Sequence, residues 1–505
     1  MKYSKLQVTI LVSIVALLFT QCKKSLLTVD PPIPIISVDN FYSNEAAAVS
    51  ATNAAYSPLT AIYNGAAWHL GDIMSDDTDL GGGGGGDGLE TADLDNFTIT
   101  SFNPIINIMW AQCYFGVLRS NLVVINVPKV PVMNDVVRKS CIGQAKFLRA
   151  LYYYQLVRLF GDVPLYTNAI SVEEAGKITR SPKADVYLQI IADLKSAETL
   201  LPNTTSLDDK GRATAGAAKG LLASVYLTLG DKVNAASKSK EVIDNKTLYG
   251  YDLWANYEAN FLLDNENGKE SLFEVQYRSG QPSFNDYSSG QKLNTFFGPR
   301  AQNVVPSAGY GWNVPTKNFV DSYEKTGTSY STIIDKRSKS SVWLPGDVFG
   351  AYTQPTQLIG SPNGFNIKKY FIPLANVAGD GGGWSSAQNV PIMRYSEVLL
   401  IYAEAAGPTL GKPAADLVRV RAGLAPLAAG LSDAVWLDAI YKERRLELGF
   451  EMHRWYDLLR HPNPNYFITV MTAAGKTNVS AKHRYMPIPQ GERDKNPNLT
   501  QNTGY

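Results

Sequence analysis

The chain has 505 residues, 45% of them hydrophobic and only three of them cysteines, so it is long enough to bury a large core without disulfides. It carries 47 basic and 46 acidic residues. Such a balance argues against nucleic acid as a partner and against a polyanionic substrate attracted by bulk charge.

The first residues have the features of a secretion signal. Lys2 and Lys5 precede an almost wholly apolar run over 8–19, which is shorter than the roughly 20 residues that span a bilayer but fits the core of a signal peptide. Residues 1–21 are therefore predicted to be a signal peptide. Its removal takes two lysines and no acid, leaving 45 basic and 46 acidic residues.

The residues around the expected cleavage point resemble a lipobox, Phe19-Thr20-Gln21-Cys22. This resemblance implies cleavage before Cys22 and diacylation of that cysteine, which would hold the protein at a membrane. The alternative is an ordinary signal peptide followed by a chance cysteine. Residues 22–35 would then form the acylated end and a tether whose prolines exclude a helix.

Hydrophobic residues recur at helical spacing through most of the region 36–248, which predicts an N-terminal helical region. In the helix predicted over 135–160, Ala145, Leu148 and Tyr152 share one apolar stripe, and Gly161 suits the left-handed position after a helix end. Helix pairs of roughly 34 residues are typical of tetratricopeptide-like repeats. We therefore expect a mainly all-α fold built on about four such pairs. Further helices are predicted over 44–63, 106–126, 182–201, 214–229 and 232–244.

A long loop is predicted over 72–103, and it contains six consecutive glycines at 81–86. No Lys-Ser or Lys-Thr follows them, so they do not form a phosphate-binding loop. One degenerate copy of a calcium-binding repeat covers 82–87, where Asp77, Asp79 and Asp87 would supply oxygen ligands. The favoured interpretation is a mobile loop that folds over a ligand, because glycine permits unusual backbone shapes. No cofactor is expected.

The C-terminal region, 249–505, begins with a loop-rich segment over 249–390 that is dominated by glycine, serine, asparagine, proline and aromatic residues. We expect this irregular segment to carry the binding face. Helices are predicted again over 391–406, 414–422 and 433–459, within a helical part that extends from 391 to 460. An extended tail follows from Tyr485.

Three carboxylates, Glu443, Glu447 and Glu451, are spaced four apart on one predicted helix. They suit either a paired-carboxylate site or a lattice of salt bridges, and the arginines interleaved with them favour the lattice. The four histidines show no zinc-site or catalytic-triad spacing. No enzymatic activity is therefore predicted. Whether Cys113 and Cys141 pair is open.

Flat aromatic side chains in loops suit the apolar faces of sugar rings, while amides and carboxylates suit the hydroxyls. Helix aromatics are more often part of the core, so only loop residues are considered. The ligand-binding candidates are Trp68, Asp76, Asp77, Tyr287, Tyr310, Trp312, Trp343, Asn366 and Trp384, with Phe365 and Asn285 as further choices.

Several stretches, taken in order, resemble the SusD/RagB family across nearly the whole mature chain. They are 143–165 (GQAKFLRALYYYQLVRLFGDVPL), Arg394-Tyr395-Ser396-Glu397, Glu443-Arg444-Arg445-Leu446-Glu447 with Arg454-Trp455-Tyr456-Asp457-Leu458, and the ending Gln501-Asn502-Thr503-Gly504-Tyr505.

The resemblance implies a non-catalytic lipoprotein of Bacteroidota, anchored in the outer membrane and exposed at the cell surface. Such a protein binds a nutrient oligosaccharide and delivers it to a SusC-like TonB-dependent transporter. Two alternatives remain open. The chain would be a peptide-capturing member of the family, or a helical scaffold that binds only its transporter partner.

Overall fold

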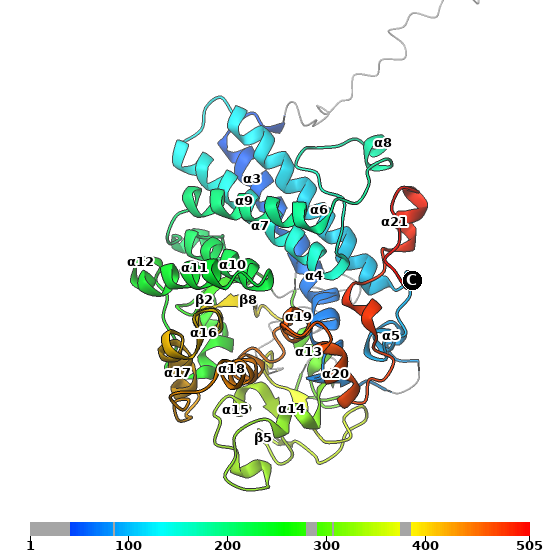
Figure 1. The fold of residues 1–505 in the computed structure, drawn as a ribbon, viewed down its shortest axis with the longest axis vertical. Helices are drawn as coiled ribbons and strands as arrows, with labels where there is room; N and C mark the ends of the chain where they lie inside the picture. The colour runs from blue at the N-terminus through cyan, green and yellow to red at the C-terminus, as the bar shows by residue number, and fades with distance from the viewer. Residues whose placement is uncertain (1–40, 84–85, 279–289, 306–307, 374–384) are drawn as a thin grey trace, which may run out of the picture. The chain divides into compact units, whose positions relative to one another are not determined.

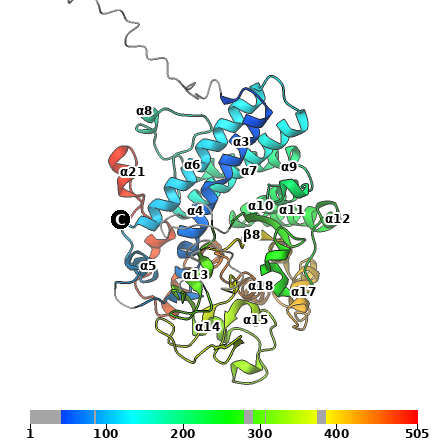
Figure 2. The ribbon, with the colours of Figure 1, turned by 180° about the vertical axis from the view of Figure 1, so that it is seen from behind.

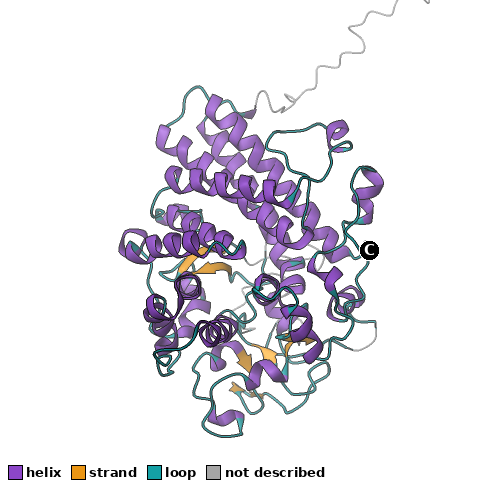
Figure 3. Cartoon of the chain, in the orientation of Figure 1, coloured by secondary structure: helices purple, strands orange, loops and turns teal. Residues whose placement is uncertain are grey.

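The computed structural model describes residues 41–83, 86–278, 290–305, 308–373 and 385–505. Asn44–Tyr505 forms one compact unit. Helices dominate it and the strands are few and short (Figure 3), so the prediction of a mainly all-α fold is confirmed.

The helices match most of the predicted segments. Those before residue 250 are α3 (Glu45–Tyr56), α4 (Pro58–Gly65), α5 (Leu89–Asp95), α6 (Pro104–Asn126), α7 (Asp135–Phe160), α8 (Val172–Ala175), α9 (Lys183–Leu200), α10 (Ala215–Thr228), α11 (Lys232–Asp244) and α12 (Lys246–Tyr249). Those after it are α13 (Leu293–Phe297), α14 (Lys317–Asp321), α15 (Ser338–Ser341), α16 (Tyr395–Leu410), α17 (Lys412–Arg421), α18 (Asp433–Glu447), α19 (Arg454–Arg460), α20 (Tyr466–Ala473) and α21 (Gln490–Lys495).

The long helices pack in a row, each against the next. Helix α6 packs on α7, α7 on α9, α9 on α10, α10 on α11, and α11 on α16, which also contacts α17 and α18 (Figures 1 and 2). Close approach depends on small residues, because a Cβ at Gly116 of α6 would lie 2.1 Å from the ring of Tyr152 on α7. This row is the expected tetratricopeptide-like scaffold.

Four two-stranded antiparallel ladders complete the fold. They are β1 (Thr78–Leu80) with β3 (Asn313–Pro315), β2 (Ser271–Val275) with β8 (Val390–Arg394), β4 (Val342–Trp343) with β7 (Asn366–Ile367), and β5 (Val348–Phe349) with β6 (Tyr352–Thr353). All four lie wholly or partly in the loop-rich segment, and β1 brings the glycine-rich stretch beside β3.

Several predicted boundaries are wrong. Helix α5 lies inside the loop expected over 72–103, and helix α21 lies inside the extended tail expected from Tyr485. The helix expected over 44–63 is divided at Ser57, because Pro58 lacks the amide hydrogen that would continue α3. The segment 390–394 is strand β8, and helix α16 begins only at Tyr395. The helix expected over 433–459 is interrupted by Phe450 and Met452, which both have positive φ.

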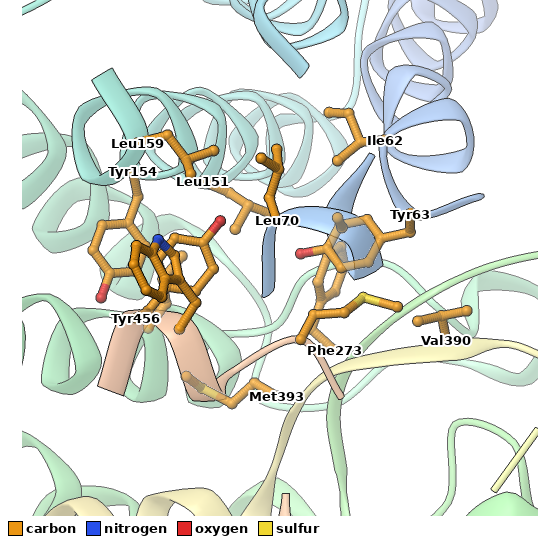
Figure 4. Close-up of a cluster of buried hydrophobic side chains, with 14 of the residues drawn as sticks. Ile62, Tyr63, Leu70, Leu151, Tyr154, Leu159, Phe273, Val390, Met393 and Tyr456 are labelled. Carbon is orange, nitrogen blue, oxygen red and sulfur yellow. The ribbon is translucent and has the colours of Figure 1, made fainter. Parts of the chain in front are cut away.

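One continuous core joins the N-terminal and C-terminal regions. In Figure 4 Tyr63 from α4, Tyr154 from α7, Phe273 from β2, Met393 from β8 and Tyr456 from α19 gather around a common centre. Helix α6 with the following turn is long and apolar enough to cross a membrane. Its packing against α4 and α7 explains that composition equally well.

The three carboxylates near α18 are buried in ion pairs, as the salt-bridge interpretation predicts. Glu443 pairs with Arg337 and Arg419, Glu447 with Arg394 and Arg421, and Glu451 with Arg394 and Lys369. All of these partners are far away in sequence, whereas the sequence pattern indicates pairs one helical turn apart. The pairs therefore connect α18 and the turn after it to four other segments.

The two cysteines of the folded unit do not form a disulfide. Cys113 on α6 and Cys141 on α7 are both buried free thiols. Burial raises the pKa of the Cys113 thiol well above its usual range, so the group stays protonated and unreactive at neutral pH.

Candidate ligand-binding site

Two of the predicted aromatic residues, Tyr310 and Trp312, lie side by side next to β3. Their ring centroids are 4.9 Å apart with an interplanar angle of 23°, and both side chains are half-buried. The amide of Tyr310 donates to the carbonyl of Thr295 and that of Trp312 to the carbonyl of Phe296. Helix α13 therefore fixes the backbone of this pair, which we call the aromatic platform.

A charged pair borders the aromatic platform. The indole Nε1 of Trp312 donates to Oδ1 of Asp87 over 3.0 Å, and the guanidinium of Arg300 lies 2.8 Å from Oδ2 of the same carboxylate. Arg300 also donates to the carbonyl of Tyr310. The side chains of Arg300 and Asp87 remain 25% and 27% exposed, so both ions reach solvent beside the rings.

Burial raises the pKa of the Tyr310 phenol above its ordinary value. The hydroxyl is therefore neutral at physiological pH and is able both to donate and to accept a hydrogen bond. The aromatic platform with its charged border thus presents stacked rings together with a cation, an anion and a neutral hydroxyl.

The glycine-rich stretch supports the aromatic platform by close backbone contact. The amides of Gly81 and Gly82 donate to the carbonyls of Trp312 and Gly311, which extends the β1–β3 ladder. A Cβ at Gly81 would lie only 1.9 Å from the carbonyl oxygen of Gly311, and one at Gly360 would lie 2.3 Å from that of Gly82. For 81–83 the expected mobile loop is replaced by tightly packed backbone, while residues 84–85 lie outside the described parts.

We expect Gly81→Ala to lower the free energy of unfolding by about 1–3 kcal/mol, because the added methyl group forces two backbone segments apart. Thermal unfolding followed by circular dichroism measures this change. Gly491→Ala on α21 is the matched control, since nothing lies within 4 Å of its added Cβ. Equal effects of the two substitutions would contradict the packing role of Gly81.

The acidic candidates Asp76 and Asp77 are buried and paired, so the expectation that they face a ligand is wrong. Asp76 pairs with Arg454 and Arg445, and Asp77 pairs with Arg445. Burial alone would raise the pKa of Asp76, but the guanidinium groups of Arg454 and Arg445 outweigh it and hold that pKa below its usual range. Both carboxylates fasten the segment before β1 to α18 and α19.

The calcium hypothesis is not supported by the positions of its three carboxylates. Asp77 faces Arg445, Asp79 lies 3.5 Å from Lys476, and Asp87 faces Arg300. Each therefore points to a different cationic side chain. Within the described ranges no group of three or more histidine, cysteine, aspartate or glutamate side chains is arranged to hold a metal ion.

Trp68, Trp343 and Asn366 are core residues, which contradicts the expectation that they contact a ligand. Trp68 is 0% exposed, donates from Nε1 to the carbonyl of Asn64 and stacks on His69. Trp343 and Asn366 are 1% exposed and face each other across the β4–β7 ladder. Phe365 is buried as well.

Tyr287, Trp384 and Asn285 lie outside the described residues, as does Cys22. Their assignments stay predictions. Of the described candidates, the structure brings Tyr310 and Trp312 together and places Asp87 and Arg300 beside them. The sequence predicts Asp87 only as a calcium ligand, and Arg300 follows a Gly-Pro pair with no pattern that indicates a role.

A separate groove of about 770 Å³ lies between α6, the segment 164–178 and the region of α21. Its rim includes Phe102, Phe115 and Val172, which are 77%, 52% and 91% exposed. Its walls are more apolar than polar, although Asn107, Glu492 and Asn496 are among the residues that line it. The aromatic platform is the better candidate for binding a sugar.

Comparison with known proteins identifies the family of the chain. Residues 269–505 match the family described as the SusD family, and residues 87–227 match the one described as starch-binding associating with outer membrane. SusD-like protein P2 of Formosa agariphila is 32% identical over 497 residues, covering 94% of this chain and 95% of that protein.

Solved structures share the fold. A laminarin-binding SusD-like protein superimposes with a TM-score of 0.78 at 28% identity, over 92% of this chain and 100% of the other. Surface glycan-binding protein A from Bacteroides thetaiotaomicron, in complex with laminarihexaose, gives a TM-score of 0.75 at 25% identity, over 91% and 99% of the two chains. The order of the helices, the identity along nearly the full length and these superpositions agree: the chain belongs to the SusD/RagB family.

Proposed function

We propose that this protein is a non-catalytic, lipid-anchored protein of the outer membrane that binds a nutrient oligosaccharide and delivers it to a SusC-like TonB-dependent transporter. The observation that carries the proposal is the aromatic platform of Tyr310 and Trp312, bordered by Asp87 and Arg300. We place the oligosaccharide on this surface.

The chemistry of the aromatic platform suits a sugar. Pyranose rings have apolar CH faces, which pack against the electron-rich faces of aromatic rings. Their hydroxyls need donors and acceptors at the edge of the stack, and Arg300, Asp87 and the Tyr310 hydroxyl supply both. Relatives that bind laminarin or laminarihexaose make a glucan the first ligand to test.

Binding without catalysis is supported by the state of the carboxylates. Glu443, Glu447 and Glu451 are each held by arginine or lysine, so their charges are already neutralised by partners. Among the described residues, Asp87 supplies the carboxylate beside the aromatic platform. It pairs with Arg300 and accepts a hydrogen bond from Trp312. Glycoside hydrolysis ordinarily needs two carboxyl groups on either side of the bond.

Calorimetry on the mature protein tests the ligand class. We expect laminarihexaose to bind and an oligopeptide of similar length not to bind, with maltohexaose as the comparison for glucan linkage. Reducing ends are measured in the same samples, and their number is expected to stay constant. Binding of the peptide alone would favour the peptide-capturing alternative, and release of reducing ends would refute the non-catalytic role.

Transporter delivery needs its own measurement. Affinity purification of the acylated protein from outer membranes is expected to recover a TonB-dependent barrel, and a Cys22→Ser variant is expected to lose its membrane attachment. Recovery of the barrel by a protein that binds no oligosaccharide would favour the scaffold alternative. Absence of any barrel would remove delivery from the proposal.

A further inference from the structure

The ammonium group of Lys476 is buried and surrounded by oxygen atoms. Its Nζ donates to the carbonyls of Ile73, Ser75 and Thr78 over 2.8, 2.8 and 2.9 Å. Two carboxylates complete the surroundings, Asp95 at 2.5 Å and Asp79 at 3.5 Å. The side chain of Lys476 is only 7% exposed.

The C-terminal end of helix α20 fixes the position of Lys476. The helix ends in a Schellman motif, in which Gly475 has φ +89° and donates to the carbonyl of Thr472, and Lys476 donates from its amide to the carbonyl of Met471. The left-handed glycine reverses the chain immediately before Lys476. The lysine therefore projects from a fixed helix end rather than from a loop.

The carbonyls that accept from Lys476 belong to the segment 73–78, which leads into β1 and includes its first residue, Thr78. In β1, Thr78 pairs with Pro315 and Leu80 with Asn313, which adjoins Trp312. Asp95 connects Lys476 to the end of β1, because its Oδ2 accepts a hydrogen bond from the amide of Leu80 and its other oxygen pairs with Lys476. One ammonium group thus fixes both the turn before β1 and the end of β1.

The residues that follow β1 form hydrogen bonds with the backbone of the aromatic platform. Gly81 and Gly82 donate to the carbonyls of Trp312 and Gly311, and Gly83 donates to the Asp87 carboxylate that accepts from the Trp312 indole. A displacement of β1 would therefore move Asp87 and the backbone that supports the ring of Trp312.

We propose that Lys476 is a positioning residue for the oligosaccharide site, acting as a built-in cation that organises the turn 73–78 and, through β1, the aromatic platform. The assignment of the ligand rests on the proposed function, whereas the ordering of β1 does not. The five oxygens form a cation site that the chain fills with its own ammonium.

The test compares Lys476→Met, which keeps the aliphatic length and removes the charge, with Lys442→Met at an exposed position of α18. Amide hydrogen exchange is followed at Leu80, Gly81 and Gly82, and laminarihexaose affinity is measured in parallel. For Lys476→Met we expect exchange at these amides to accelerate about tenfold or more, because several buried acceptors lose their donor. Helices α6 and α7 are expected to keep their rates.

A rescue experiment separates positioning from general destabilisation. In Lys476→Ala, propylammonium ions are expected to restore slow exchange at 80–82 and tighter glucan binding, and sodium chloride of the same ionic strength is not. If the Lys476 variants do not fold, Asp95→Asn gives the same readout, since it weakens the ion pair and keeps an acceptor for Leu80.

The outcomes are distinct. Unchanged exchange at 80–82 in the folded variants, or acceleration of equal size throughout the chain without rescue by propylammonium, would overturn the role of Lys476. Absence of glucan binding by the unmodified protein would count against the proposed ligand alone, because the exchange measurement still decides whether Lys476 orders β1.

Discussion

Replacing Glu447 by glutamine is expected to lower the free energy of unfolding by about 3–5 kcal/mol at pH 7, the usual cost of removing one partner from a buried ion pair. Glu447 is 0% exposed. Its carboxylate accepts from Arg394 at 2.9 Å and pairs with Arg421, and its second oxygen lies 3.5 Å from Arg337. The amide would leave these buried guanidinium groups short of one negative charge.

The effect of Glu447→Gln is expected to depend on pH in a definite direction. Burial alone would raise the pKa of Glu447, but Arg421, Arg394 and Arg337 outweigh burial and hold that pKa well below its usual range. The folded state therefore releases this proton more readily than the unfolded state, whose carboxyl titrates near pH 4.3. The stabilisation is fully present above that pH and is lost as the pH falls toward the depressed value.

Urea unfolding of both proteins at pH 7 and at about pH 3.5 measures this difference. The difference in the free energy of unfolding between the unmodified protein and Glu447→Gln is expected to be smaller at the lower pH. Glu173→Gln serves as the control, because Glu173 is 80% exposed in its pair with Lys177 and such surface pairs contribute less than about 1 kcal/mol. If this difference in the free energy of unfolding does not change with pH, the charge of Glu447 does not stabilise the fold.

The second large effect is expected from Trp312→Ala, which removes half of the aromatic platform. We expect laminarihexaose affinity to fall about 30-fold or more, the consequence of losing about 2 kcal/mol at a central aromatic contact. The substitution also deprives Asp87 of its indole donor and leaves Arg300 as the group that orients it. Calorimetry measures the affinity, and circular dichroism confirms that the helices persist.

Two further variants define the cause of that loss. Trp312→Phe keeps an aromatic face and removes the hydrogen bond to Asp87, so an intermediate affinity is expected. Trp254→Ala removes a partly exposed tryptophan that contacts Lys269 elsewhere on the protein, and it is expected to bind normally. An unchanged affinity of Trp312→Ala would place the oligosaccharide away from the aromatic platform.

The sequence predicted the helical scaffold well where local signals agree. For α7 and α11 the predicted and observed bounds coincide, because an apolar stripe is closed by a cap at each end. The strand β8 was missed, since the apolar run at 390–394 suits a helix or a buried strand equally. Its pairing with β2 decides the matter, and that pairing joins residues far apart in sequence.

The candidate site was predictable only in part for the same reason. Tyr310 and Trp312 stand out as loop aromatics, but so do Trp68 and Trp343, and only tertiary packing separates the half-buried pair from the buried ones. Arg300 and Lys476 have no local pattern that marks them. Their roles arise from contacts made across the fold, such as the bond from Lys476 to Thr78, which are 398 positions apart.

The long-range ion pairs and hydrogen bonds of the segment 72–80 affect the order in which the protein folds. Arg445 and Asp77 are 368 positions apart, and Lys476 and Ile73 are 403 apart. Contacts of such long range close late, because the entropy of a very large loop is lost before they form. We therefore expect the aromatic platform and β1 to assemble only after the last tenth or so of the polypeptide has docked, and a truncated chain to keep its early helices without an ordered aromatic platform.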